Sequence, residues 1–368
     1  MSRKYVISLE RLNRFCTDLF KGYGVTNEDA KIFAEALVKT EARGVKSHGV
    51  VRIKNYIDRI VSGTLDVTKD ITILKETPTT ALIDGNNGIG IVISKKAVEI
   101  ARKKAEENGI GFVSVRRSNH FGAAGIWGLE LSGDDMIGIC ATNSEPIVSA
   151  PTGKTRALGS NPFSITAPAK KYPHVSLDIS NGVMALGKIY EYKRLGKPFP
   201  EGSWLDTNGN PTTDPNINPI PEFIMRPFGM HKGFGLTVMM EILTAILAGG
   251  EFGPQVSSVY RDIDKPNPIS HFFIAIRIDY FRELNDFKAT MDELIDYLHE
   301  LPVQSGNSKV LYPGEKGAAV SEKKLKTGII LGEDVVNELL NMATDKGMDI
   351  SNSPFEIAPD DFEEITQI

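Results

Sequence analysis

The chain has 368 residues, of which 24% are charged, and its formal net charge at pH 7 is -5. This length exceeds one ordinary hydrophobic core, so two substructures are expected. The acidic balance provides no basic surface for nucleic acid, which we exclude as the main partner. The longest apolar stretch, residues 236–248, is too short to cross a bilayer, and the first ten residues lack the apolar run of a signal peptide. These features predict a cytoplasmic protein with no membrane partner.

The cysteines and histidines indicate no metal site. Cys16 and Cys140 both lie in apolar segments, which is typical of a reducing compartment and not of a disulfide framework. The six histidines are scattered and show no H-E-x-x-H spacing, so we expect no catalytic metal. The segment Gly153-Lys154-Thr155 resembles the end of a phosphate loop, but Val148 stands where that motif requires glycine.

Helices are predicted in the N-terminal quarter, where apolar residues recur at helical spacing. The first follows Ser8, and the second opens at Thr26-Asn-Glu-Asp29, which resembles a capping box. A third is expected from Ser47, as its N-cap, to about residue 62. Beside its apolar face this helix carries a polar stripe of His48, Arg52, Tyr56 and Arg59. Such a stripe either lines a cleft or forms a solvated basic face.

The central part of the chain reads as short strands, with a helix over residues 92–104. Gly85, Gly88 and Gly90 in this part have the spacing G-x-x-G-x-G, whereas a Rossmann dinucleotide fold requires G-x-G-x-x-G. A strongly apolar helix over residues 231–248 is expected to be buried centrally. Strands are predicted at residues 71–74, 80–83, 111–115, 136–142, 163–167, 175–179 and 271–276, and later helices at 284–300 and 333–346.

These patterns predict a mixed α+β fold that is not of the Rossmann type. Residues 1–70 and 285–368 would form a helical substructure, and residues 71–284 a domain built on a mixed β-sheet. Residues 197–227 are rich in proline, asparagine and threonine, which indicates a long excursion or lid.

The most distinctive segment is Val113–Gly125, where a buried strand leads into Asn119 and His120 and then into a turn of small residues. A histidine at a strand end, followed by glycines that allow close approach, is a common way to build a reactive site. On the residues alone, an idle loop histidine is the more frequent explanation. With Arg52 and Lys232, however, His120 would form a set of donors suited to a small anionic substrate.

Several motifs, taken together, resemble the type 2 malate/L-lactate dehydrogenase family. They occur in order between about residues 5 and 345. The family also contains sulfolactate, ureidoglycolate and diketogulonate enzymes and a cyclic imine reductase. The matching segments are Gly44-x-x-Ser47-His48-Gly49 followed by Arg52 and Tyr56, Ser118-Asn-His-Phe-Gly122, Pro151-x-Gly153, Ser160-Asn-Pro162, Asp178-Ile-Ser180, Gly187-Lys188, His231-Lys-Gly-Phe-Gly-Leu236, His271-Phe-Phe-Ile274 and Pro313-Gly-Glu315.

The resemblance implies an oxidoreductase that uses NAD, with NADP as an alternative, and that is usually a homodimer. Residues 71–284 would then bind the cofactor, and His120 would exchange the proton. His48 and Arg52 would act with it at the substrate. Further substrate contacts would come from Ser47, Tyr56 and Asn119, and cofactor contacts from Asp178, Ile179, Ser180, Lys232, Gly314 and Glu315.

We therefore predict hydride transfer between NAD(P) and a small 2-hydroxy or 2-oxo acid, with malate and oxaloacetate as the first choice. Lactate, sulfolactate and ureidoglycolate are alternatives, as is reduction of the cyclic imine piperideine-2-carboxylate. A ligand-binding homologue without catalysis is the alternative from a different class. One departure from the family pattern is Asn181-Gly-Val-Met184, which follows Asp178–Ser180 in place of an alanine-rich turn and leaves NAD or NADP preference open.

Overall fold

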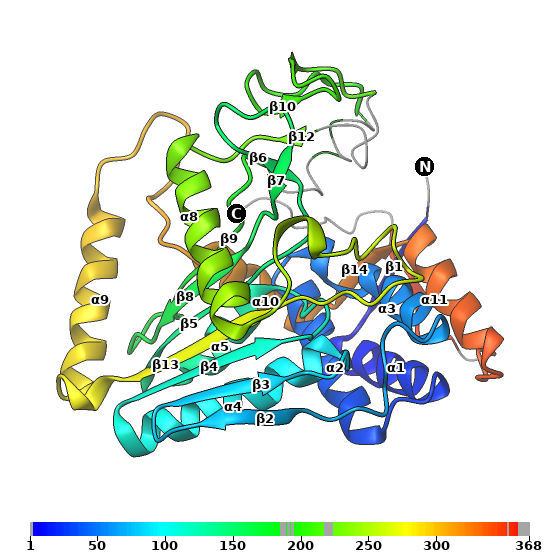
Figure 1. The fold of residues 1–368 in the computed structure, drawn as a ribbon, viewed down its shortest axis with the longest axis horizontal. Coiled ribbons are helices and arrows are strands. Elements are labelled where there is room, and N and C mark those ends of the chain that lie inside the picture. Colours follow the sequence, from blue (N-terminus) through cyan, green and yellow to red (C-terminus); the bar gives the residue numbers. More distant parts are fainter. Residues whose placement is uncertain are drawn as a thin grey trace.

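The computed structural model describes residues 3–184, 189, 192, 195–216, 224–351 and 353–359. The motif Gly187-Lys188 lies outside these residues. The described chain forms a mixed α+β fold with three β-sheets, as predicted, and Figure 1 shows their arrangement. Among the described helices, none combines the length and the apolar character that a membrane span requires.

The largest sheet has seven strands in the order β2-β3-β4-β13-β5-β8-β9. Only β3 and β4 pair in parallel, so the sheet lacks the parallel architecture of a Rossmann domain. Most of its strands coincide with predicted segments. They are β2 (Thr72–Glu76), β3 (Thr80–Asp84), β4 (Ile110–Arg116), β13 (His271–Arg277), β5 (Met136–Thr142), β8 (Phe163–Ala167) and β9 (Val175–Ile179).

Alternating side chains carry the two faces of this sheet into different cores. Cys140 and Phe273 pack with helices α4 (Gly90–Asn108) and α5 (Ala124–Ser132). Their neighbours in sequence, Ala141 and Phe272, pack with helix α8 (His231–Glu241) on the opposite face. Because successive side chains of a strand point to opposite faces, the sheet lies between the layer formed by α4 and α5 and the helix α8.

Segments from both ends of the chain pack together around a second sheet. Strand β1 pairs with β14 and β15, and the register matches Lys4 with Gly332. Ser8 and Thr26 accept hydrogen bonds from the backbone of Arg11 and Asp29, which confirms the two predicted N-caps. These elements are β1 (Lys4–Ile7), α1 (Leu9–Gly22), α2 (Asn27–Ala42), α3 (Ile53–Val61), α10 (Glu315–Thr327), β14 (Ile329–Gly332), α11 (Glu333–Asp345) and β15 (Glu356–Ile357).

A third sheet of short strands forms in and beside the predicted excursion, in the order β11-β10-β12-β6-β7. Helix α9 (Leu284–Glu300) stands at the edge of the molecule in Figure 1. The five strands are β6 (Val148–Ser149), β7 (Arg156–Leu158), β10 (Trp204–Leu205), β11 (Pro211–Thr212) and β12 (Ile224–Met225).

The expected third helix was wrong at its start. Two short 3-10 turns, Lys46–His48 and Val50–Arg52, precede α3, which begins at Ile53. Gly49 separates these turns, and a Cβ there would lie 2.1 Å from Glu41 Oε2. The Glu41 carboxylate accepts a hydrogen bond from the Val50 amide, so the chain must pass too close to it for a continuous helix.

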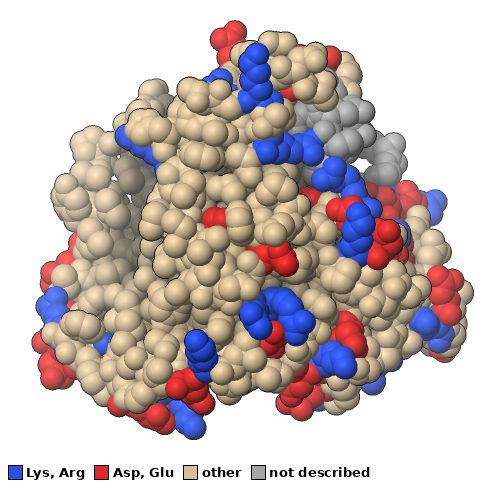
Figure 2. All heavy atoms as spheres, viewed as in Figure 1, with Lys and Arg blue, Asp and Glu red and all other residues tan. Residues whose placement is uncertain are grey.

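The predicted apolar helix exists, but its expected central burial was wrong. After α8 the chain continues in a π-helical turn, Ile242–Ile246. The side of this segment that faces the sheet buries the polar residues Thr237, Glu241 and Thr244, whereas Ile242 and Ile246 are 42% and 50% exposed. Figure 2 shows few charged side chains over this part of the surface. Part of the apolar surface of this segment is therefore turned outward, while Leu236, Met240 and Leu243 pack on the sheet.

Candidate active site

His120 lies just beyond strand β4, in a turn that an ion pair holds. Arg117 adopts a left-handed φ of 47°, and its Nε donates to Asp84 Oδ1 at 2.9 Å. His120 Nδ1 lies 2.6 Å from the Tyr56 hydroxyl and 3.3 Å from the Gly122 amide nitrogen, which donates to it. The structure thus joins His120 to Tyr56, a residue of the polar stripe on α3.

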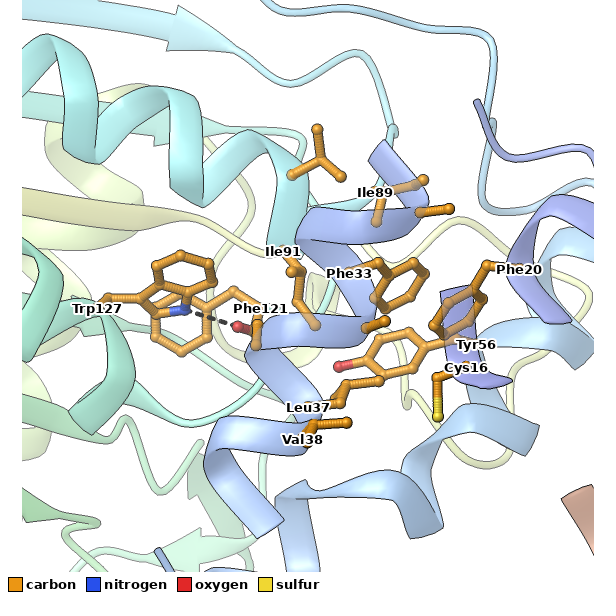
Figure 3. Packing of buried hydrophobic residues seen from close by; sticks show 14 of the residues in the cluster. Cys16, Phe20, Phe33, Leu37, Val38, Tyr56, Ile89, Ile91, Phe121 and Trp127 are labelled. Atoms are coloured by element: carbon orange, nitrogen blue, oxygen red, sulfur yellow. Dashed lines mark hydrogen bonds between the residues drawn. The ribbon is translucent and has the colours of Figure 1, made fainter. Parts of the chain in front are cut away.

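The core between α1, α2 and α3 fixes Tyr56. Its ring is 2% exposed and meets Phe33 edge to face, with ring centroids 4.8 Å apart. Phe33 in turn stacks on Phe20 at 4.0 Å. Figure 3 shows Tyr56 beside these rings, with Leu37 next to it. Because packed rings have few alternative rotamers, the hydroxyl of Tyr56 is held in place for His120.

A second histidine faces the first. The rings of His48 and His120 lie nearly parallel with centroids 5.6 Å apart, and the Ser47 hydroxyl lies 2.9 Å from His48 Nδ1. Enclosure by protein and the charge of Arg52 lower the pKa of His48 to about 4. Enclosure also lowers the pKa of His120 well below its usual value, with His48 and Arg52 adding to the effect. Both rings are neutral at pH 7.

Arg52 is held on two sides. Its Nε donates to the Ser47 carbonyl at 2.6 Å, and its guanidinium lies over the Tyr260 ring at 4.6 Å from the centroid. Its side chain lines a cavity of about 320 Å³ that shares Ser47 with the cavity containing the histidines. Within the described chain its terminal nitrogens make no hydrogen bond, which leaves them available to a carboxylate.

The two histidines open into a cavity of about 140 Å³, which we call the substrate cavity. Its walls combine hydroxyl groups, one carboxylate and apolar side chains. The residues that line it include Ser47, His48, His120, Gly122, Asn143, Ser144, Glu145, Ser160, Ser180, Met184, Met225 and Tyr260.

A second, larger cavity of about 290 Å³ lies beside it, and we call it the cofactor cavity. Asp178 and Ile179 of β9 line it, together with Gly314 and Arg43. The Asp178 side chain is exposed to this cavity. The protein atoms that surround its carboxyl nevertheless raise the pKa to about 6. The Gly125 amide and the charge of Arg43 oppose this increase. A Cβ at Gly125 would lie 2.5 Å from Asp178 Oδ2, so glycine is required there.

The end of β9 connects the two cavities. Ile179 lines the cofactor cavity, and the next residue, Ser180, lines the substrate cavity. In the turn after His120, Ala123 lines the cofactor cavity and Gly122 lines the substrate cavity. An extended ligand could therefore cross this strand end and place one end at His120. The cofactor cavity fits a dinucleotide, because its glycines allow close approach to the backbone and the Asp178 carboxylate can accept a hydrogen bond from a ribose hydroxyl.

Three predicted site residues lie elsewhere. The Asn119 amide donates to the carbonyls of Asn87 and Gly88 at 3.1 and 3.0 Å, so it holds the turn instead of lining a cavity. Lys232 is exposed at the start of α8 and lines neither cavity. The Glu315 carboxylate does not line the cofactor cavity either, and its described partners are His299, at 3.0 Å, Lys309 and the Tyr312 amide. It thereby holds the turn that carries Gly314.

Sequence reasoning missed the polar tip that follows β5. Asn143, Ser144 and Glu145 come directly after this strand and line the substrate cavity. The Asn143 amide reaches the buried Glu241 of α8, which also accepts a hydrogen bond from Asn161 at 2.5 Å. The signal was available, because a buried strand delivers these residues as β4 delivers His120.

Among the described residues, no group of three or more histidine, cysteine or acidic side chains could hold a metal ion. The groups that the site does offer are the neutral histidine pair, the arginine beside it and a neighbouring cavity suited to a dinucleotide.

Comparisons with known proteins agree with this geometry. The family described as malate/L-lactate dehydrogenase matches residues 7–340. A malate dehydrogenase of Pyrococcus horikoshii is 38% identical over 347 residues, which cover 92% of this chain and 95% of the relative. The solved sulfolactate dehydrogenase of Methanocaldococcus jannaschii is 37% identical, covers 94% of this chain and 99% of its own, and has a TM-score of 0.87.

Another relative carries its cofactor in its name. A ureidoglycolate dehydrogenase of Escherichia coli, named for NAD⁺, is 29% identical and covers 92% of this chain and 95% of its own length. These matches confirm the predicted class of oxidoreductase. The chain belongs to the malate/L-lactate dehydrogenase family.

Proposed function

We propose that this protein interconverts malate and oxaloacetate with a nicotinamide cofactor. The observation that carries the proposal is a neutral His120, held by Tyr56, at the point where the substrate cavity meets the cofactor cavity. The 38% identical malate dehydrogenase supports malate as the substrate. Sulfolactate is the second candidate, because a relative of that name is 37% identical over nearly the whole chain.

His120 exchanges the proton in this proposal. The Gly122 amide can only donate, so Nδ1 accepts and the neutral ring carries its proton on Nε2. In reduction, the ring must first gain a second proton, and the imidazolium then donates its Nε2 proton toward the substrate carbonyl oxygen and returns to the neutral form. In oxidation, Nε2 must accept the hydroxyl proton, and the Tyr56 hydroxyl can then turn to accept from Nδ1. A partner that can both donate and accept thus serves both directions.

Arg52, His48 and Ser47 orient the substrate. The terminal nitrogens of Arg52 bind the carboxylate next to the reacting carbon, and stacking on Tyr260 fixes the orientation of the planar guanidinium. A neutral His48 donates a hydrogen bond without competing for the proton, because its pKa is about 4. These groups hold the substrate oxygen near His120 and so reduce the entropy cost of reaction.

NAD is the proposed cofactor, with NADP as the alternative. When bound, it supplies the hydride for reduction and accepts it in oxidation. Asp178 would accept from the adenosine ribose, Ile179 and Gly314 would contact its apolar parts, and Ser180 would lie toward the nicotinamide end. Glu315 would act by holding Gly314, and Lys232, which lines neither cavity, would contact a part of the cofactor that extends beyond them.

Two further proposals concern the location of the protein in the cell and the division of the chain into two parts. Cys16 and Cys140 are buried, free thiols, which supports a cytoplasmic location in a reducing environment. The division into a helical part, residues 1–70 with 285–368, and a cofactor-binding part, residues 71–284, is also a proposal. The pairing of β1 with β14 supports the joining of both chain ends in one part.

The main test is a panel of oxo acids with NADH and NADPH. We expect oxaloacetate to be reduced with the highest kcat/KM, ahead of sulfopyruvate, pyruvate and piperideine-2-carboxylate. His120→Gln should lower kcat on the order of 10²–10⁴-fold while cofactor binding, followed by fluorescence, stays near that of the wild type. Cofactor binding with no turnover of any compound would support a catalytically silent homologue, and preferred reduction of the cyclic imine would refute malate.

Tyr56→Phe tests the proton partner. The ring would keep its packing against Phe33, whereas the hydrogen bond to His120 would be lost. We expect kcat to fall about tenfold, with an altered pH profile and an unchanged thermal midpoint. Wild-type kcat between about pH 6 and pH 9 would show that Tyr56 has no part in proton exchange.

Asp178→Asn tests the assignment of the cofactor cavity. The carboxylate is ionised above its pKa of about 6, and the ionised form accepts from a ribose hydroxyl and repels a 2′-phosphate. We expect the variant to lose preference for NAD over NADP, measured as the ratio of kcat/KM. In the wild type the same ratio should fall as the pH drops through about 6, because protonation removes the charge. If neither the substitution nor the change in pH alters the ratio of kcat/KM for NAD and NADP, Asp178 has no part in cofactor selection.

We propose that the chain forms a homodimer through the outward face of α8 and its π-helical turn. Met239, Ile242 and Ile246 expose 49%, 42% and 50% of their surface, and such apolar patches commonly mark interfaces. We expect a dimer in analytical ultracentrifugation and a monomer for Ile242→Glu with Ile246→Glu. Leu325→Glu, at an apolar residue of α10 that is 66% exposed, is the matched control and should remain dimeric. A dimeric double variant would contradict this interface.

A further inference from the structure

Two charged side chains of opposite sign line the cofactor cavity. Asp178 lies near the end of β9, and Arg43 directly follows helix α2. Among the described residues that line this cavity, no others are charged. The hydroxyl groups of Thr40 and Ser176, which also line it, are already bonded, to a carbonyl of α2 at 2.7 Å and to a threonine of β8 at 2.9 Å. A ligand in the cavity therefore meets Asp178 as an acceptor and Arg43 as a donor.

The end of α2 fixes the position of Arg43. The Arg43 amide donates to the Lys39 carbonyl at 3.1 Å and so closes the last turn of the helix. In the same turn, the Glu41 carbonyl accepts a hydrogen bond from the buried Lys324 of α10 at 2.8 Å. Gly44, with a left-handed φ of 85°, then lets the chain leave the helix. Arg43 is thereby held at the junction of α2 and α10.

The Arg43 guanidinium lies against the first turn of α10. A Cβ at Gly317 would lie 3.4 Å from Arg43 Nη2 and 3.7 Å from Arg43 Cζ. Gly317 and Gly314, which precedes this turn, line the cofactor cavity together with Arg43. The guanidinium therefore lies at the part of the cavity wall that the start of α10 forms.

Within the described chain, this guanidinium makes no hydrogen bond and no ion pair. Burial lowers the pKa of Arg43, whereas the charge of Asp178 raises it, so the carboxylate is near without being in contact. A half-buried guanidinium whose donors are unused has lost part of its hydration without gaining hydrogen bonds, which is unfavourable. An anion bound in the cavity would accept those hydrogen bonds.

We propose that Arg43 binds the 2′-phosphate of NADP, so that the cofactor cavity accepts both NAD and NADP. This inference rests on the proposed function, in which Asp178 lies at the adenosine ribose. A carboxylate that accepts from the 2′-hydroxyl selects NAD, and an arginine beside the same ribose accommodates a 2′-phosphate through parallel hydrogen bonds. This cavity carries one group of each kind.

The separation of the two charged groups allows both uses. An ion pair between Asp178 and Arg43 would occupy the acceptor and the donors together, and the structure does not form one. Asp178 therefore stays available to a ribose hydroxyl and Arg43 to a phosphate. When NADP is bound, the guanidinium offsets the repulsion between the phosphate and the Asp178 carboxylate, which limits the preference for NAD.

Fluorescence titrations of Arg43→Gln with NADH and NADPH test the proposal without turnover. We expect the Kd for NADPH to rise on the order of 10- to 100-fold, because charge-assisted hydrogen bonds to the phosphate are lost. The Kd for NADH should stay within about twofold, which also shows that the variant is folded. Arg43→Lys keeps the charge without the two-pronged donor geometry, so its Kd for NADPH should lie between those of the wild type and Arg43→Gln.

Nucleotide fragments locate the contact. Adenosine 2′,5′-bisphosphate carries the 2′-phosphate and adenosine 5′-monophosphate lacks it, so Arg43→Gln should weaken the binding of the bisphosphate alone. Asp178→Asn should bind NADPH more tightly than the wild type, and adding Arg43→Gln should remove that gain. Arg14→Gln removes one positive charge at a side chain of α1 that is 72% exposed, and this matched control should change neither Kd.

Equal losses for NADH and NADPH in Arg43→Gln would place the arginine at a part common to both cofactors and overturn the proposal. An unchanged Kd for NADPH would also overturn it, as would a wild-type protein that binds NADH alone. A wild-type protein that binds neither cofactor would refute the proposed function together with this inference. Binding of both cofactors through Arg43 without reduction of any oxo acid would refute the proposed reaction and uphold the role of Arg43.

Discussion

The hydrogen bond between the Tyr56 hydroxyl and His120 Nδ1 connects the helical part of the chain with the end of a sheet strand. Phe20 and Phe33 position the donor, and the ion pair of Arg117 with Asp84 positions the turn that carries the histidine. The packing of α1, α2 and α3 against the seven-stranded sheet therefore decides whether the reactive group points into its cavity. Tyr56, on the buried side of α3, makes this connection.

Each of three residues of the polar stripe contacts a different part of the fold. Arg52 stacks on Tyr260, Tyr56 reaches His120, and Arg59 binds the carbonyls of Asp262 and Lys265. The 3-10 turn and the short helix α3 thus hold both the reactive histidine and the segment that follows Tyr260. Since enclosure keeps His48 and His120 neutral, the positive charge beside them is that of the Arg52 guanidinium.

Helix α8 shows how a buried polar side can be compatible with an apolar surface. Glu241 faces inward because it binds Asn143, Asn161 and the Gly253 amide, groups that shape the wall of the substrate cavity. The helix can bury only one side against the sheet, so its other apolar residues face outward. These polar bonds, together with the packing of Leu236, Met240 and Leu243 on the sheet, determine which side is inside.

The sequence by itself determined the strands of the large sheet, two helix caps, the absence of a Rossmann fingerprint and, through ordered motifs, the family. These depend on local periods and spacings that a single chain displays. Only the tertiary structure decided that Asn119 and Glu315 hold turns, that α8 exposes part of its apolar surface, and that Glu145 lines the substrate cavity. Such contacts join residues far apart in sequence, and the direction of a side chain depends on which polar partner the fold brings within reach.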